Sequence, residues 1–363
     1  MLYHATRVYV FLGLLFMTLM NFASNNQSLF SLGLREYVYV DESRVFDNQS
    51  RKLEVTVWYP TSDITSAEVI NNDIWKVKNV VRNASFPANT NLPLIMFSHG
   101  FSGNQWQNCW FAEFFAARGF IVAAVRHYGN SMPLMIPEIC IRSWNRPQDM
   151  SFALDHILAQ PDLKNYIDQD NIFAAGFSQG GATCMWLAGV QAELTPENIK
   201  EQFTMMNAPD LRSKFFSNVS NEKMDSLLDE FTAQDFQEAN RSYYDSRFKA
   251  VFGIAPAIDD QNVMFTKQGL AKATTPAYLI VGESDEGTTE QIPFFAAHIP
   301  QCIGIIIPGH VTHWTMLNEG TEKGKKERPY ITIDHESVDR SKIHEETALR
   351  ALDFFSMHLN NNL

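Results

Sequence analysis

The chain has 363 residues, of which 45% are hydrophobic and 19% are charged, and this apolar content excludes a disordered protein. Its net charge of -12 excludes a nucleic-acid partner, because phosphate binding needs a basic face and the sequence has no long run of Lys and Arg. The length is compatible with one large α/β domain.

The first residues have the composition of a leader. Arg7 precedes an uncharged apolar run from Val8 to Met20, which has the length of a signal-peptide core and is short for crossing a bilayer. We therefore predict a signal peptide or N-terminal anchor at residues 1–24, and we favour cleavage. The remaining domain, residues 25–363, would then be secreted or periplasmic, or attached to a membrane if the leader is retained.

Strand and helix patterns then alternate along the chain. A leading pair of strands is predicted at Glu36–Val40 and Leu53–Tyr59, where apolar and polar residues alternate. Short apolar runs typical of buried parallel strands follow at Leu94–Ser98, Phe120–Val125, Ile172–Ala175, Ala250–Ala255, Ala277–Val281 and Ile303–Ile307. Helices are expected at Cys109–Ala117, Asp149–Ala159, Gly181–Ala192 and Thr347–Leu359. This order predicts a doubly wound, mostly parallel sheet with helices on both faces.

One segment interrupts the alternation. Residues 193–246 contain polar, acidic helical patterns and no convincing strand. An insertion at this point can cover the carboxyl ends of the strands, where α/β proteins bind ligands. We predict a helical cap or lid, and the alternative is a surface decoration unrelated to the site.

The four cysteines are compatible with an oxidising compartment. None lies in a C-x-x-C pair or in a His-rich cluster, so we predict no zinc or other metal site. The sequence allows a bridge between Cys109 and Cys140 but does not establish it. Cys184 is expected to be a small buried apolar residue.

The motif that carries chemistry is Gly176-Phe177-Ser178-Gln179-Gly180, between the strand Ile172–Ala175 and a helical pattern. A serine hydroxyl needs a base to remove its proton and must project toward a carbonyl. A strand–turn–helix with flanking glycines presents it in this way. We predict that Ser178 is a nucleophile and that the Gln179 N–H donates a hydrogen bond to the oxyanion.

A second oxyanion donor is expected from the loop after an earlier strand. In Ser98-His99-Gly100-Phe101-Ser102-Gly103 the glycines let the backbone bend over the nucleophile, and we assign the donor to the Phe101 N–H. His99 precedes the nucleophile in the chain. We interpret it as a structural histidine that hydrogen-bonds to the backbone.

If Ser178 lies on such a nucleophile turn, the acid and the base should follow it in the chain in that order. After the strand Ala277–Val281, Asp285 is the preferred acid, and Glu283 is the next candidate. Asp259 and Asp260 are further alternatives. The base is His313 or His310, both of which follow the last strand, and the residue pattern alone does not separate them.

These pieces together resemble a known family. The chain is similar to the serine-dependent relatives of dienelactone hydrolase, a group similar to platelet-activating factor acetylhydrolase, over nearly its whole length after the leader. The resemblance is carried by the order of Val55–Pro60, Ser98–Gly103, Gly119–Ala124, Arg146-Pro147 with Asp149, the Ser178 elbow and Thr312-His313-Trp314.

The resemblance implies an α/β-hydrolase fold with a helical cap. It implies Ser178 as nucleophile, Asp285 as acid and His313 as base, with the amides of Phe101 and Gln179 as oxyanion donors, and no cofactor. His310 would then line the pocket or its rim. Phe177 departs from the family, which more often has a histidine before the nucleophile. A serine at the elbow also argues against dienelactone substrates, whose hydrolases use a cysteine there.

The sequence therefore predicts a serine hydrolase that cleaves carboxylic esters, with short-chain esters as the default substrates. The alternative within enzymes is a phospholipase A2-like or platelet-activating-factor-acetylhydrolase-like lipid esterase, and the same triad also serves amidases. From other classes we considered a non-catalytic binding protein on a hydrolase scaffold and an envelope-tethered interaction protein whose cap docks a partner. The sequence does not define the oligomeric state.

Overall fold

The computed structural model describes residues 29–64, 67, 68, 70, 72–200, 209–257 and 264–360. The predicted leader, residues 1–24, and the alternative acids Asp259 and Asp260 lie outside these ranges. Among the described residues, no helix is both long and apolar enough to cross a membrane.

In the part of the chain that the structure describes, the strands form one nine-stranded sheet and one small two-stranded sheet. They are β1 (Ser31–Phe46), β2 (Gln49–Thr61), β3 (Val81–Arg82), β4 (Leu92–Ser98), β5 (Ile121–Arg126), β6 (Asn130–Ser131), β7 (Leu134–Met135), β8 (Ile167–Phe177), β9 (Phe248–Ile254), β10 (Ala277–Gly282) and β11 (Cys302–Ile307). The order in the large sheet is β11-β10-β9-β8-β4-β5-β2-β1-β3. The strands from β5 to β11 in this order are parallel, and β2 pairs antiparallel with both β5 and β1.

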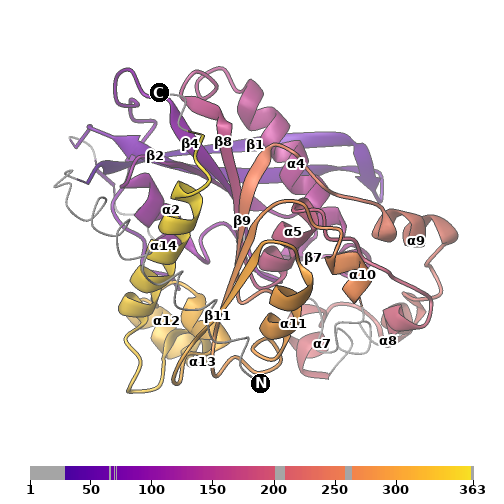
Figure 1. The fold of residues 1–363 in the computed structure, drawn as a ribbon. Coiled ribbons are helices and arrows are strands. Elements are labelled where there is room, and N and C mark those ends of the chain that lie inside the picture. Colours follow the sequence, from indigo (N-terminus) through magenta and orange to yellow (C-terminus); the bar gives the residue numbers. More distant parts are fainter. Residues whose placement is uncertain are drawn as a thin grey trace, which may run out of the picture.

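The helices lie on both faces of the sheet (Figure 1). They are α2 (Cys109–Ala116), α3 (Pro137–Cys140), α4 (Asn145–Ala159), α5 (Gln179–Leu187), α7 (Pro209–Phe215), α8 (Asn221–Ser226), α9 (Ala233–Asn240), α10 (Lys267–Leu270), α11 (Gln291–His298), the 3₁₀ helix η1 (His313–Met316), α12 (Glu322–Glu327), α13 (Pro329–Thr332) and α14 (Arg340–Ser356). Figure 1 shows α2 and α14 together on one side of the sheet and α4, α5 and α11 on the other. The predicted doubly wound architecture is confirmed.

The central strands are apolar and buried, as a parallel sheet covered on both faces requires. Every residue of β10 is buried, and β4, β5 and β9 each have a single partly exposed residue. Because the chain runs from β4 to β5 on one side and later returns to β8 on the other, the strand order reverses at β4. The carboxyl ends of β4 and β8 therefore lie at the switch point, where this architecture typically binds ligands.

Several element boundaries differ from the prediction. Helix α4 begins at Asn145 rather than Asp149, because Pro147 lies within the first turn, where the backbone N–H groups have no helical partner. Helix α5 ends at Leu187, just before Gly189 with φ of +103°. Helix α14 begins at Arg340, after Asp339, whose side chain accepts a hydrogen bond from the Lys342 N–H.

All four cysteines are free thiols. The bridge that the sequence allowed between Cys109 and Cys140 is absent. The Cys140 thiol instead contacts the Gly129 carbonyl oxygen at 3.1 Å, and burial raises its pKa to about 12. Cys184 is buried in the core, as we expected.

Candidate active site

Ser178 lies at the turn between β8 and α5, at the end of the strand next to β4. Its backbone has φ of +54° and ψ of -122°, a conformation that L-residues rarely adopt. Two hydrogen bonds hold it there. The Ser178 N–H donates to the Ile254 carbonyl at 2.8 Å, and the Ala257 N–H donates to the Ser178 carbonyl at 3.2 Å. The serine is therefore presented on a constrained turn, as a nucleophile elbow requires.

Asp285 and His313 are in direct contact. The Nδ1 atom of His313 lies 2.8 Å from Oδ2 of Asp285. The Asp285 side chain is 2% exposed and that of His313 is 20% exposed, so the imidazole lies between a buried carboxylate and the surface. An ionised carboxylate only accepts hydrogen bonds, so Nδ1 carries the proton of the neutral ring and Nε2 is left with a free lone pair. This is the tautomer that a general base needs.

Phe177 is adjacent to Ser178 in the chain and to the Asp285–His313 pair in space. Its ring centroid lies 4.7 Å from that of His313, and Phe177 directly precedes Ser178. Phe177 is 1% exposed. Its ring therefore packs against the imidazole rather than forming an open pocket wall. Among the described residues, no hydrogen bond joins the Ser178 hydroxyl to His313, and hydrogen bonds between catalytic groups are often long or poorly aligned without substrate.

The structure places the alternative acid and base elsewhere. Glu283 is exposed, and its Oε2 accepts a hydrogen bond from the Gly309 N–H at 2.6 Å. His310 is also exposed, and its ring lies 4.0 Å from that of His335. Neither residue contacts the Asp285–His313 pair through a hydrogen bond within the described residues.

The two predicted oxyanion amides come from α5 and from the loop that packs against Ser178. Gln179 is the first residue of α5, so its N–H is one of the unpaired donors at a helix N-terminus. The loop that carries Phe101 approaches closely, because a β-carbon on Gly100 would be 3.3 Å from that of Ser178 and 2.9 Å from the Phe177 ring. Neither the Gln179 N–H nor the Phe101 N–H donates to another described residue. Both are free to bind an oxyanion.

The predicted cap contacts residues 98–103, the loop that carries Phe101, which we call the oxyanion loop. Within the described parts of residues 193–246 the elements are helices α7, α8 and α9, and none is a strand. The rings of Phe215 and Phe216 lie 5.3 and 6.4 Å from the ring of Phe101. Lys214 lies over the ring of Tyr330 at 4.3 Å. Helix α7 therefore stands beside the oxyanion loop, and the role of residues 193–246 as a cap stays a prediction.

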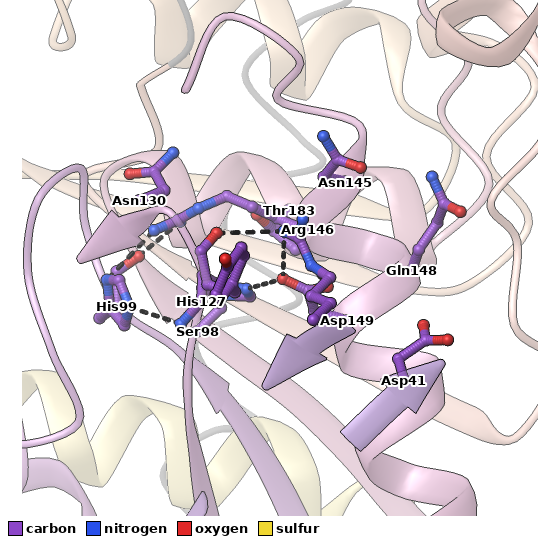
Figure 2. A network of polar contacts seen from close by, with 12 residues as sticks. Asp41, Ser98, His99, His127, Asn130, Asn145, Arg146, Gln148, Asp149 and Thr183 are labelled. Carbon is purple, nitrogen blue, oxygen red and sulfur yellow. Dashed lines mark hydrogen bonds and ion pairs between the residues drawn. The ribbon is translucent and has the colours of Figure 1, made fainter. Parts of the chain in front are cut away.

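A second hydroxyl–imidazole–carboxylate series, which the sequence analysis did not find, lies beneath the oxyanion loop (Figure 2). Ser98 Oγ is 2.8 Å from Nε2 of His127, and Nδ1 of His127 is 2.9 Å from Oδ2 of Asp149. Arg51 binds the same carboxylate at 2.6 and 3.0 Å. All three members of the series are fully buried, which separates them from any substrate.

The surroundings of this buried series determine the protonation states of His127 and Asp149. Burial, and then the nearby Arg146, lower the pKa of His127 to about 3, so the ring is neutral. Burial opposes ionisation of Asp149, but Arg51 and Arg44 outweigh it and hold the pKa of that carboxyl well below its usual value. The Ser98 hydroxyl therefore donates to the neutral imidazole, which donates to the carboxylate.

No metal-binding arrangement appears in the part of the chain that the structure describes: no group of three or more His, Cys, Asp and Glu side chains is placed to hold an ion.

Comparisons with known proteins bear on the fold and on the broad activity. The structure is similar to that of a ferulic acid esterase from Streptomyces cinnamoneus, with a TM-score of 0.57 and 19% sequence identity over 93% of this chain and 92% of that one. The chain has the α/β-hydrolase fold. No curated protein sequence matches the chain.

Residues 45–136 of this α/β-hydrolase match the family of platelet-activating factor acetylhydrolase, isoform II. This match bears out the resemblance inferred from the motifs and, with it, the prediction of a carboxylic ester hydrolase. The narrower likeness to dienelactone hydrolases stays a prediction. The matched segment includes the oxyanion loop and ends before Ser178, so the assignment of the triad depends on the geometry described above.

Proposed function

We propose that the protein is a serine esterase in which Ser178 is the nucleophile, His313 the base and Asp285 the acid. The observation that carries the proposal is the hydrogen bond between the buried Asp285 and His313, beside a serine held at a positive φ. Two unpaired backbone amides at the same point supply the oxyanion site. The match to the acetylhydrolase family supports the same chemistry.

The reaction has two acyl-transfer steps. His313 Nε2 takes the proton of the Ser178 hydroxyl as its oxygen attacks the ester carbonyl, and the Phe101 and Gln179 N–H groups bind the resulting oxyanion. The protonated His313 gives its proton to the leaving alcohol, and the acyl group stays on Ser178. His313 then takes a proton from water as that water attacks the acyl-enzyme, and it returns this proton to the Ser178 oxygen as the acyl bond breaks and the carboxylic acid leaves.

For the substrate we propose short-chain carboxylic esters, with lipids that carry a short or oxidised acyl chain as the second candidate. The rings of Phe101, Phe215 and Phe216 give an apolar boundary beside the oxyanion loop, which suits an acyl chain. The acetylhydrolase family match favours the lipid candidate. Values of kcat/KM for p-nitrophenyl esters of increasing acyl length decide whether the acyl pocket is long, because a short pocket gives a sharp fall beyond the shortest chains.

The nucleophile is tested with a fluorophosphonate probe, followed by mass spectrometry of the modified peptide. We expect one adduct, on Ser178, and its loss in Ser178→Ala. A folded wild-type protein without any adduct would favour a binding protein on a hydrolase scaffold. An adduct without turnover of esters, but with turnover of the matching amides, would indicate an amidase.

We also propose that the protein acts outside the cytoplasm, either secreted or held at a membrane by residues 1–24. The support is the apolar run Val8–Met20 after Arg7. Expression of the full-length chain, followed by fractionation and N-terminal sequencing, tests this. A cytoplasmic protein that retains its first residues would contradict it.

A further inference from the structure

The carbonyl group of Gly100 and the N–H group of Phe101 belong to one peptide unit. This unit is planar and trans, so its C=O and N–H point in opposite directions. Groups that bind the Gly100 oxygen therefore also determine where the Phe101 N–H points. The Gly100 oxygen lies 2.6 Å from Nδ1 of His99, 3.1 Å from Nη2 of Arg146 and 3.1 Å from the Gly103 N–H.

His99 is a hydrogen-bond donor to this oxygen. Its Nε2 accepts from the His127 backbone N–H at 3.1 Å, so Nε2 carries no proton. Burial, and then the positive charge of Arg146, keep the pKa of His99 well below its usual value, so the ring is neutral and its single proton is on Nδ1. The 3.1 Å contact between Nδ1 and Arg146 Nη2 therefore joins two donors and is not a hydrogen bond.

Among the three donors to the Gly100 oxygen, Arg146 is unusual because it is a buried cation. It comes from the first turn of α4, is 1% exposed, and points its guanidinium toward His99 (Figure 2). Its Nη1 lies 2.6 Å from the His99 oxygen, in addition to the contact with the Gly100 oxygen. No carboxylate among the described residues forms an ion pair with Arg146, because Asp149 is bound by Arg51, Arg44 and His127.

A buried guanidinium without an ion-pair partner is costly, so its position requires an explanation. Burial lowers the pKa of Arg146 to about 9, which still leaves it protonated at neutral pH. Hydrogen bonds in a chain polarise one another, most strongly in a low-dielectric interior. A cation on the carbonyl side of a peptide unit therefore makes the N–H on its other side a stronger donor.

We propose that Arg146 is a positioning residue for ester hydrolysis: it binds the carbonyl of the Gly100–Phe101 peptide, and so aims and strengthens the Phe101 N–H that receives the oxyanion. The proposal rests on the serine-esterase function proposed above. Because the oxyanion exists only in the tetrahedral intermediate and its transition states, the contribution of Arg146 appears in kcat rather than in substrate binding.

The kinetic test compares Arg146→Lys and Arg146→Met with Arg44→Met. Arg44 belongs to the same network, but it binds Asp41 and Asp149 and not the loop carbonyls. Loss of a whole oxyanion donor costs about 100- to 1,000-fold in kcat, so weakening one should cost about 10- to 100-fold with KM changed by about twofold or less. Arg146→Lys should lose less kcat than Arg146→Met, because lysine keeps the positive charge but cannot bind the His99 and Gly100 carbonyls with two parallel N–H groups. Arg44→Met should leave kcat close to wild type.

A spectroscopic test does not depend on activity. The sequence has three Gly–Phe pairs, at residues 100–101, 119–120 and 176–177, so a protein labelled with ¹³C-carbonyl glycine and ¹⁵N phenylalanine gives three carbonyl–amide correlations. We expect the Gly100 carbonyl to be the most downfield of the three in the wild type. In the Arg146 variants its carbon and the Phe101 proton should both move upfield, while the other two correlations stay in place.

The outcomes separate this inference from the proposed function. A wild-type protein without esterase activity would refute the function, while the Gly100–Phe101 correlation would still report whether Arg146 polarises the peptide. Folded Arg146 variants with wild-type kcat and an unmoved correlation would overturn the inference. If neither variant folds, a wild-type Gly100 carbonyl that is not downfield of the other two would overturn it.

Discussion

The carbonyl oxygen of Ser98 fills the space that a β-carbon on Gly180 would need. Strand β4 and the first turn of α5 therefore pack backbone to backbone directly below the nucleophile. Residue 180 must be glycine because any side chain would prevent this contact. The contact also places the oxyanion loop, which follows Ser98, next to Ser178.

Gly180→Ala should consequently destabilise the fold by about 3 kcal/mol, because the clash is with a rigid backbone. Gly181→Ala is the matched control, since its β-carbon would meet Pro256 at 3.0 Å and a small shift relieves the contact. Urea unfolding of both variants measures the difference. Equal midpoints for the two proteins would contradict this account of the elbow.

The serine of the proposed triad, Ser178, and the serine of the buried series, Ser98, should differ in reactivity. Ser178→Ala should reduce kcat by about 10⁴-fold or more and remove fluorophosphonate labelling. Ser98→Ala should still be labelled on Ser178, because Ser98 is fully buried and no probe reaches it. Labelling and peptide mapping of both variants check this. An adduct on Ser98 in a protein that retains this residue would contradict the assignment of Ser178 as the nucleophile.

Asp285→Asn should lower kcat by about 10⁴-fold, because an amide no longer fixes the proton of His313 on Nδ1. Glu283→Gln in the same loop keeps an oxygen that accepts from the Gly309 N–H, and it should retain most of the activity. Steady-state kinetics with one short-chain ester compares them. A larger loss in Glu283→Gln than in Asp285→Asn would transfer the role of the acid to Glu283.

The predicted cap should influence the acyl-chain preference through Phe215. Its ring is perpendicular to that of Phe101, so Phe215→Ala opens space beside the oxyanion loop. We expect kcat/KM for longer p-nitrophenyl esters to rise relative to the acetate. Phe236→Ala is the matched control, because Phe236 packs against Phe231 within the cap. Unchanged length profiles in both variants would show that α7 does not limit the acyl site.

The buried His127 should make the protein sensitive to acid. Its pKa is about 3 in the folded protein against 6.5 for an ordinary histidine, so as the pH falls through 6.5 the unfolded chain takes up a proton that the folded chain does not. Stability is therefore lost from about pH 6.5 downward. Between pH 7 and pH 5 the wild type should lose about 2 kcal/mol more than His127→Asn, as measured by urea unfolding.

If the pH profiles of His127→Asn and wild type were parallel, His127 would not be neutral in the folded protein.

The sequence was sufficient for the parts of the site that depend on local order. The elbow, the oxyanion loop and the order of Ser178, Asp285 and His313 follow from short motifs attached to apolar strands. The buried series of Ser98, His127 and Asp149 was missed, because three separate elements bring it together through the register of parallel strands. A partial signal was present in Arg146-Pro147 with Asp149, which the family resemblance had already singled out.

The remaining errors have local physical causes. Strand β8 begins at Ile167, five residues before the predicted strand, because Asp168 and Asn171 interrupt the apolar run. Helix α14 begins earlier than predicted, because residues such as Arg340 and His344 are polar yet buried. Arg340 is held by Asp334 and by three backbone carbonyls, contacts that no periodicity of apolar residues reveals.

The four free thiols have a consequence for how the chain reaches its folded state. A cross-link would shorten the loops of the unfolded chain and reduce its conformational entropy. This protein has no such constraint, so packing and hydrogen bonding alone hold the nine-stranded sheet together. The fold can therefore form without any disulfide being made or exchanged.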